Sequence, residues 1–341
     1  MSKRNLNRRQ RHRIQKVQEE RLERARKKDQ AIDAQAEEGE LGEPQPGLIV
    51  AHFGVTTDVE TQDGRVTRCH KRSNLPALVT GDRVIWQEDS QGSGVIVACE
   101  DRTSLLSRPD VRGQLRPVAA NIDRIIIVCA PAPRTPVNLI DRYLVAAAHH
   151  GIRPILVLNK SDCLEQAPDM AREMEEYRDL GYEVHTLSAQ TEAGMAEIRT
   201  LLAAGNSVFV GQSGVGKSSI IAALLPEEEI RVASISESTG KGRHTTTTAR
   251  LYHIPGGGNL IDSPGIREFG LWHIEPEDLF QAFPELSNLS GHCKFRDCSH
   301  ENEPGCAVRD AVESGRILER RYRSFLAIRD SLDEVAMREL L

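Results

Sequence analysis

The spacing of apolar residues divides the chain into four segments, and the first of them has almost no apolar periodicity. Residues 1–46 begin with a basic stretch and continue as an acidic stretch that contains Pro and Gly. A segment of this composition cannot bury enough apolar surface to form a core. We therefore expect a basic, disordered arm and linker over residues 1–46.

Residues 47–108 carry short runs in which apolar and polar residues alternate. They predict strands over residues 48–55, 65–70, 83–86 and 94–99, with turns at Asp63-Gly64 and Gly81-Asp82. Several short strands in so short a segment predict a small β-barrel, with an OB-fold as the leading candidate. Its basic residues offer an RNA-facing surface, although an ordinary solvated barrel face gives the same pattern. These residues are Arg65, Arg68, Lys71, Arg72 and Arg83.

Residues 109–275 alternate apolar runs with helical patterns, which is typical of a doubly wound α/β domain. The predicted helices cover residues 139–150 and 170–180. The predicted strands of a largely parallel sheet cover residues 125–129, 155–158, 184–187, 208–210 and 260–261.

Residues 276–341 contain a cluster of Cys and His followed by one predicted amphipathic helix over residues 307–338. Acidic residues interleave with the arginines of this helix, so we expect a solvated face of ion pairs. Contact with RNA or protein is the alternative. The arginines are Arg309, Arg316, Arg320, Arg321, Arg323 and Arg329.

The composition is that of a soluble protein with ordinary cores, at 341 residues, 39% hydrophobic and 28% charged. The apolar runs are too short to cross a bilayer, and the N-terminus lacks the apolar region of a secretory signal. We expect a cytoplasmic monomer that does not bind membranes. Residues 1–28 hold 12 Lys or Arg against 3 Glu, so the other 313 residues carry a net charge of −15. A basic arm on an acidic body is common in proteins that contact nucleic acid, and a solubilising tail is the alternative.

The most specific motif is a phosphate-binding loop that reads G-Q-S-G-V-G-K-S from residue 211. An apolar strand leads into it and a helix is predicted from Lys217, the context that such a loop requires. Backbone N–H groups and the helix N-terminus would surround the phosphates. We expect Lys217 to contact the β and γ phosphates and the Ser218 hydroxyl to bind Mg²⁺. The expected binding residues are Gly211, Gln212, Ser213, Gly214, Val215, Gly216, Lys217, Ser218 and Ser219.

Two further motifs select guanine over adenine. Residues Asn159, Lys160, Ser161 and Asp162 read N-K-x-D directly after a predicted strand. A carboxylate at Asp162 can accept hydrogen bonds from N1–H and N2–H₂ of guanine, a pair that adenine lacks. Lys160 would pack over the base and the phosphate-binding loop. The pair Ser188-Ala189 follows another predicted strand and offers a backbone N–H for guanine O6.

The remaining GTPase motifs concern Mg²⁺ and the γ-phosphate. Asp262 and Gly265 form D-x-x-G, in which Asp262 should hold Mg²⁺ through a water and Gly265 should contact the γ-phosphate. One threonine upstream should complete the metal shell, and any of three fits. They are Thr245, Thr246 and Thr247.

Ile266 stands where Ras-like enzymes carry the glutamine that orients the attacking water. We therefore expect slow intrinsic hydrolysis that depends on a partner. His244 is a hypothesis for the residue that positions the water, and binding of solvent or RNA by this side chain is the alternative.

Cys293, Cys298, His300 and Cys306 have the spacing C-x₄-C-x-H-x₅-C. Three thiolates and one imidazole fill a tetrahedral Zn²⁺ shell and leave no position for catalysis. We expect one structural zinc ion, and the alternative is four unrelated residues.

The order of these motifs is unusual, because the phosphate-binding loop follows N-K-x-D along the chain. Ordinary small GTPases have the reverse order, so the sequence predicts a circularly permuted GTPase domain. The γ-phosphate motif then stands shortly before the zinc-binding segment, and a change of nucleotide should move that segment.

With these motifs in this order, the chain resembles the RsgA (YjeQ) family of small ribosomal subunit biogenesis GTPases. The resemblance extends from residue 48 to the C-terminus and rests on residues 159–162, 211–219, 242–247, 262–265 and the four Cys and His. It implies an N-terminal OB-fold, a circularly permuted G domain and an α-rich zinc-binding domain. It also implies docking on the small (30S) subunit and its rRNA late in assembly, with hydrolysis stimulated by that subunit. Release of the protein, and of an assembly factor such as ribosome-binding factor A, would follow.

Two other functions fit the residues alone. One is a signalling GTPase regulated by protein partners, and the other is an RNA-binding protein that holds GTP without significant turnover. A salt-dependent preference for rRNA would distinguish a ribosomal factor from the signalling GTPase. Measured GTP turnover would distinguish it from the RNA-binding protein without turnover.

Overall fold

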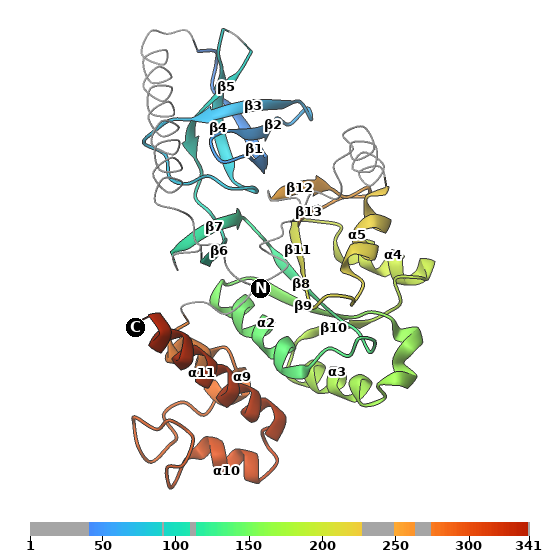
Figure 1. Ribbon diagram of the computed structural model, residues 1–341, viewed down its shortest axis with the longest axis vertical. Helices are drawn as coiled ribbons and strands as arrows, with labels where there is room; N and C mark the ends of the chain where they lie inside the picture. The colour runs from blue at the N-terminus through green and yellow to red at the C-terminus, as the bar shows by residue number, and fades with distance from the viewer. Residues whose placement is uncertain (1–40, 91, 110–113, 227–248, 263–273, 340–341) are drawn as a thin grey trace, which may run out of the picture. The chain divides into compact units, whose positions relative to one another are not determined.

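The computed structural model describes residues 41–90, 92–109, 114–226, 249–262 and 274–339. The chain divides into two units, Met1–Arg102 and Thr103–Leu341. Each unit is described by itself, with element labels as in Figure 1. Within the described ranges, no helix has the length and apolar character needed to span a membrane.

The first unit contains a five-stranded β-barrel. Its strands pair in the order β1-β2-β3-β5-β4, and a further β1–β4 pairing closes it. Apolar side chains and Trp86 point inward to form the core, in which Ile49, Val59 and Trp86 are fully buried. The predicted N-terminal barrel is confirmed, and the strand that the sequence did not predict is β2. The strands are β1 Gln45–His52, β2 Thr57–Glu60, β3 Val66–Lys71, β4 Arg83–Glu88 and β5 Gly94–Cys99.

The second unit opens with a two-stranded hairpin, β6 Leu105–Pro109 and β7 Leu115–Ala120, and continues into a larger sheet. Within this sheet the strand order is β10-β9-β8-β11-β13-β12. All its pairings are parallel except β12–β13. Its strands are β8 Arg124–Cys129, β9 Arg153–Leu158, β10 Glu183–Thr186, β11 Asn206–Val210, β12 Arg250–His253 and β13 Asn259–Asp262.

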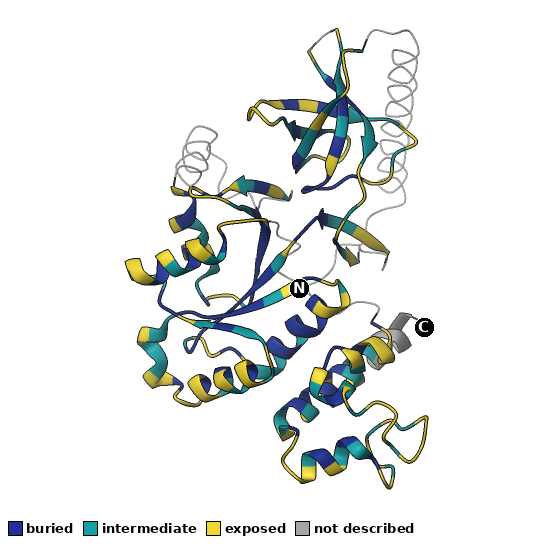
Figure 2. Ribbon diagram, turned by 180° about the vertical axis from the view of Figure 1, so that it is seen from behind, coloured by how far each residue is buried: buried dark blue, intermediate teal, exposed yellow. Residues whose placement is uncertain are grey.

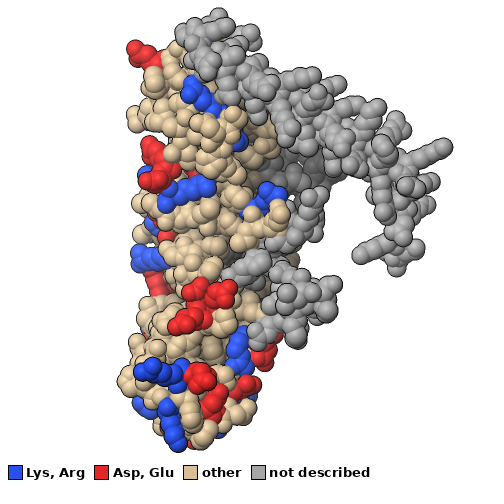
Figure 3. All heavy atoms as spheres, turned by 90° about the vertical axis from the view of Figure 1, so that its left-hand side faces the viewer, with Lys and Arg blue, Asp and Glu red and all other residues tan. Residues whose placement is uncertain are grey.

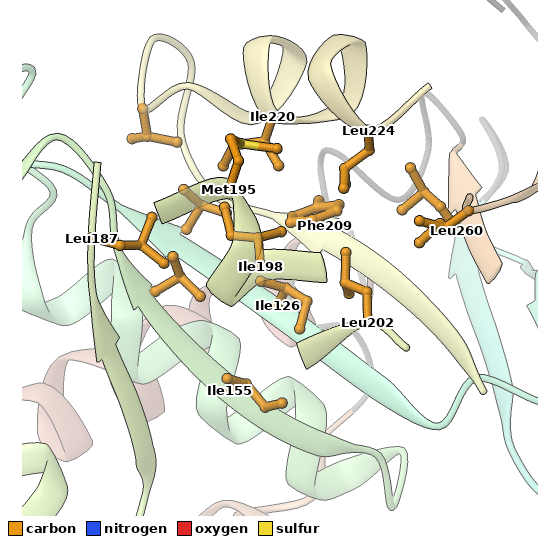
Figure 4. Close-up of a cluster of buried hydrophobic side chains, with 14 of the residues drawn as sticks. Ile126, Ile155, Leu187, Met195, Ile198, Leu202, Phe209, Ile220, Leu224 and Leu260 are labelled. Carbon is orange, nitrogen blue, oxygen red and sulfur yellow. The ribbon is translucent and has the colours of Figure 1, made fainter. Parts of the chain in front are cut away.

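Helices cover both faces of this sheet, so its strands are buried along most of their length (Figure 2). On one face α4 and α5 pack on the strands through a cluster that includes Ile126, Ile198 and Phe209 (Figure 4). Helices α2 and α3 pack against the sheet through their own buried residues, such as Leu144 and Met174. These helices are α2 Val137–His149, α3 Asp169–Asp179, α4 Glu192–Leu201 and α5 Lys217–Leu224, with the 3-10 helix η1 at Ser161–Gln166.

This α/β domain has the permuted order that the sequence predicted, and the prediction is confirmed. The guanine motif follows β9, the phosphate-binding loop follows β11, and D-x-x-G begins at the end of β13. The carboxyl ends of neighbouring parallel strands meet at one edge of a sheet, where ligands bind in folds of this class. The permutation therefore changes the order in which the chain connects the strands, and the motifs still meet at the carboxyl edge of the sheet.

The C-terminal region is helical, but the single helix predicted over residues 307–338 is wrong. The chain forms two helices there, because Gly315 adopts a left-handed conformation with φ of 75°. Its N–H donates to Val312 O and the N–H of Ile317 donates to Ala311 O, a pattern that ends a helix. The helices of this region are α8 Pro276–Gln281, α9 Pro284–Ser287, α10 Ala307–Glu313 and α11 Glu319–Glu339.

Candidate nucleotide-binding and metal sites

The phosphate-binding loop joins the buried strand β11 to the N-terminus of α5. Gly216 is the N-cap of this helix, with φ of 106°. A Cβ atom there would lie 2.3 Å from Asn159 Nδ2, so both conformation and space require glycine. Lys217 Nζ donates to the carbonyls of Gly211 and Gln212 at 2.5 and 2.7 Å. The amine is thus held inside the loop, where phosphate oxygens would bind.

Asn159 connects the guanine motif to both neighbouring motifs. Its side chain is 2% exposed, and Nδ2 donates to Val215 O at 2.9 Å in the phosphate-binding loop. Its Oδ1 accepts from the N–H of Ala189, also at 2.9 Å. One buried amide therefore fixes three motifs that lie far apart in sequence.

Lys160 and Asp162 are the two charged residues of the guanine motif, and each has protein partners that hold it. Lys160 has a left-handed backbone, with φ of 59°, and its Nζ donates to Ala132 O and Gly214 O at 2.7 Å. A hydrogen bond from the Ser188 hydroxyl, with a second from the Cys163 thiol, holds the pKa of Asp162 below its usual range. The carboxylate is exposed and ionised at neutral pH, as acceptance of two guanine N–H groups requires.

Asp262 ends β13, which pairs in parallel with β11, so Asp262 and the phosphate-binding loop share one sheet edge. Ser218 lies in the first turn of α5. A carboxylate and a hydroxyl are the oxygen donors that Mg²⁺ prefers. The other predicted residues of the Mg²⁺ and γ-phosphate site lie outside the described residues. They are His244, Thr245, Thr246, Thr247 and Gly265.

The sequence did not single out the segment between β8 and α2, which contacts the nucleotide motifs directly. The Gln212 side chain donates to the carbonyls of Pro133 and Arg134, both at 3.1 Å. On α2 the buried Tyr143 lies near the backbone of Gly211. A tyrosine in an apolar helix is the one sequence signal for this contact, and it does not specify the partner.

The four predicted metal ligands lie together, with their ligand atoms all within 4.8 Å of one another. His300 Nδ1 is 3.5 Å from the sulfurs of Cys293 and Cys306, which are 4.0 Å apart. A tetrahedral site with Zn–S of about 2.3 Å and Zn–N of about 2.0 Å has S···N and S···S separations of about 3.5 and 3.8 Å. The donor set and its dimensions therefore fit one tetrahedral metal ion.

The surroundings of this cluster hold the ligands in place. The His300 ring stacks on Phe280 of α8, with centroids 4.7 Å apart, and Tyr322 of α11 donates to His300 O at 2.6 Å. Burial, followed by the neighbouring thiols Cys306 and Cys293, raises the pKa of Cys298 to about 12. Ionisation of the Cys298 thiol at neutral pH therefore requires a nearby cation, which a bound metal provides.

Two of the five basic residues predicted for the barrel surface are paired with acidic neighbours. Arg65 pairs with Glu88 at 2.9 Å, and Arg68 pairs with Asp58 while its guanidinium stacks 4.5 Å from the Phe53 ring. Phe53 is 45% exposed, so this stacked pair faces solvent. An RNA-facing role for this surface stays a prediction.

The arginines of the C-terminal helices differ from one another, which corrects the predicted solvated face. Basic and acidic side chains are interspersed in this region, at the lower end of Figure 3, and Arg323 pairs with Glu319 in solvent. Arg321 instead is 1% exposed. It lies on the side of α11 that packs against the α/β domain, and its charge is compensated there by Asp141 and Glu285.

Comparison with known proteins gives concordant matches. The family model of the RsgA GTPase matches residues 99–272. A protein of Azotobacter vinelandii named small ribosomal subunit biogenesis GTPase RsgA is 56% identical over 340 residues, which cover 98% of this chain and 99% of that protein. A protein of the same name from Pseudomonas aeruginosa is 54% identical over 336 residues, with the same coverage.

Two solved structures share the fold. The crystal structure of YjeQ from Thermotoga maritima matches with a TM-score of 0.69 and 34% identity, over 85% of this chain and 99% of that chain. The structure of YloQ, described as a circularly permuted GTPase, matches with a TM-score of 0.68 and 29% identity, over 86% and 96% of the two chains.

Proposed function

This chain belongs to the RsgA GTPase family, and on that premise we propose that it binds the small (30S) ribosomal subunit and acts in its late maturation. The observation that carries the proposal is the meeting of Asn159, Asp262 and the phosphate-binding loop at one sheet edge, in permuted order. Relatives named small ribosomal subunit biogenesis GTPase RsgA support the choice of substrate and partner. We further propose that the barrel spans residues 47–108, the G domain residues 109–275 and the zinc-binding domain residues 276–341.

GTP binds with its base at Asp162 and its phosphates along residues 211–219. Lys217 now donates to two loop carbonyls, and phosphate oxygens would take over part of this coordination without a large movement of the amine. Ser218 and, through a water, Asp262 would hold the Mg²⁺ ion, which neutralises phosphate charge when it is bound.

Intrinsic hydrolysis is slow because Ile266 cannot orient water, and the subunit completes the site. His244 positions the water, and one of Thr245, Thr246 and Thr247 joins the metal shell. His244→Ala tests the first assignment. Unchanged stimulated turnover in this variant would reject it.

The cluster of Cys293, Cys298, His300 and Cys306 holds one structural zinc ion. When bound, the ion would cross-link the four ligands and so stabilise the loop that carries them. The protein acts as a cytoplasmic monomer that contacts rRNA through basic side chains. Hydrolysis releases it from the subunit, together with ribosome-binding factor A.

Co-sedimentation tests the binding cycle. The protein should pellet with small subunits in a non-hydrolysable GTP analogue, and it should remain in the supernatant in GDP. Large subunits should not retain it in either nucleotide. Equal retention on both subunits would reject a specific role in small-subunit maturation, and equal retention in both nucleotides would reject release by hydrolysis.

A further inference from the structure

Arg321 lies at the centre of a buried, charged junction between α11 and the G domain. Its Nη1 donates to Asp141 Oδ1 on α2 at 2.5 Å, and its Nε donates to Glu285 Oε1 on α9 at 2.6 Å. The guanidinium also stacks 4.4 Å from the Phe283 ring. Arg321 and Asp141 are 1% and 0% exposed, so neither charge is compensated by solvent.

The same helix α2 is attached to the C-terminal helices at two further points. Arg142 Nη2 donates to Ser331 Oγ of α11 at 2.5 Å. His149 Nδ1 lies 3.6 Å from Asp278 Oδ2 of α8. Through these contacts a displacement of α8 or α11 would act directly on helix α2.

The segment that leads into α2 is attached to the phosphate-binding loop. Directly before α2, the carbonyls of Pro133 and Arg134 accept hydrogen bonds from the Gln212 side chain, both at 3.1 Å. The carbonyl of Gln212 in turn accepts from Lys217 Nζ at 2.7 Å. The path from Arg321 to Lys217 thus runs through Asp141, helix α2 and the hydrogen bonds of Gln212.

Stability alone does not explain a buried ion pair of this kind. Removing two charges from water costs about as much as their attraction returns, and apolar side chains of similar volume often replace such pairs without loss. Among the described residues, Asp141 Oδ2 has no hydrogen-bond partner. The carboxylate therefore keeps an acceptor position that a displaced guanidinium could occupy.

We propose that Arg321 is a positioning residue for GTP hydrolysis, which transmits displacement of the C-terminal helices through Asp141 and helix α2 to Gln212 of the phosphate-binding loop. This inference rests on the proposed function, because the displacement is supplied by the small subunit. It is separate from the covalent connection through residues 263–273, which lie outside the described residues.

The test compares intrinsic and subunit-stimulated GTP turnover in the full-length protein. Arg321→Met removes the charge and keeps most of the volume, and Arg321→Lys keeps the charge but cannot bridge two carboxylates. Arg323→Met is the matched control, since Arg323 lies on the same helix with its side chain 74% exposed. If Arg321→Met folds poorly, the double variant Asp141→Leu/Arg321→Met replaces the pair with apolar groups.

Arg321→Met and the double variant should keep intrinsic turnover within about twofold, while stimulated turnover falls roughly 5- to 150-fold, the usual range of coupling between sites. The stimulated turnover of Arg321→Lys should lie between that of these variants and that of the unaltered protein. Binding to subunits in a GTP analogue should not change. A merely structural role would lower both rates together, and this result would overturn the inference.

Unchanged stimulation in the folded double variant would also overturn it and leave the proposed function standing. Absence of stimulation in the unaltered protein would reject the proposed function, and the inference with it.

Discussion

Replacing Asn159 by alanine is the sharpest perturbation of the nucleotide site, because one side chain holds three motifs together. The change removes the donor to Val215 O and the acceptor for the Ala189 N–H. It leaves the fold of β9 intact, since the backbone N–H of residue 159 still donates to Cys129 O.

The magnitude follows from the burial of the two groups that lose their partner. Val215 is fully buried, so its carbonyl remains unsatisfied at a cost of about 2 kcal/mol. The N–H of Ala189 is half-buried and can be solvated in part, so loss of its hydrogen bond costs about 1 kcal/mol. A total of about 3 kcal/mol lowers the Tm of a unit the size of Thr103–Leu341 by roughly 6–12 °C.

Differential scanning calorimetry measures this shift, and titration with fluorescent GDP measures the site. GDP affinity should fall about tenfold, because binding must then restore the arrangement of the motifs. Asn288→Ala is the control, since Asn288 is exposed in the same unit. A Tm and GDP affinity equal to those of the control would refute the role of Asn159 as the connection between the motifs.

Three further predictions concern the metal, the base and pH. Cys306→Ser should reduce zinc from about one ion per chain to a small fraction in elemental analysis, and it should open the loop to protease while the barrel stays resistant. Asp162→Asn should weaken GTP binding about a hundredfold or more and favour xanthosine triphosphate, whose carbonyl at C2 accepts from an amide; equal binding of the two nucleotides by both proteins would contradict this. Burial, with a smaller effect of His149, lowers the pKa of His150 to about 4. The unfolded chain therefore binds the extra proton between pH 6.5 and 4, and stability should fall as pH decreases through this window. Urea midpoints of His150→Gln should show a smaller slope there, and an equal slope would reject the assignment.

Much of the G domain could be predicted because its signals are local. The buried strands β8 and β9 contain long apolar runs, β11 ends in three apolar residues, and the guanine and phosphate motifs directly follow β9 and β11. Strand β2 has only four residues, three of them polar and one of these, Thr57, buried, so its sequence shows no clear apolar pattern. Gly315 carried a helix-stop signal that the surrounding amphipathic pattern obscured.

The junction at Arg321 could not be predicted, because its partners lie far away in the sequence. Asp141 stands in an apolar helix, which is a signal of a buried polar role, but nothing near it identifies Arg321 as the counterion. In the same way, the hydrogen bonds from Gln212 to the carbonyls of Pro133 and Arg134 depend on the segment before α2 packing beside the phosphate-binding loop. Local patterns give elements and motifs, and tertiary packing decides which charged residue is buried.

The central claim is tested most directly by GTP turnover of the purified protein alone, with small subunits, with large subunits and with free rRNA. The account predicts slow turnover alone and strong stimulation by small subunits only, with loss of both rates in Lys217→Ala. Equal, slow turnover under all four conditions would contradict it.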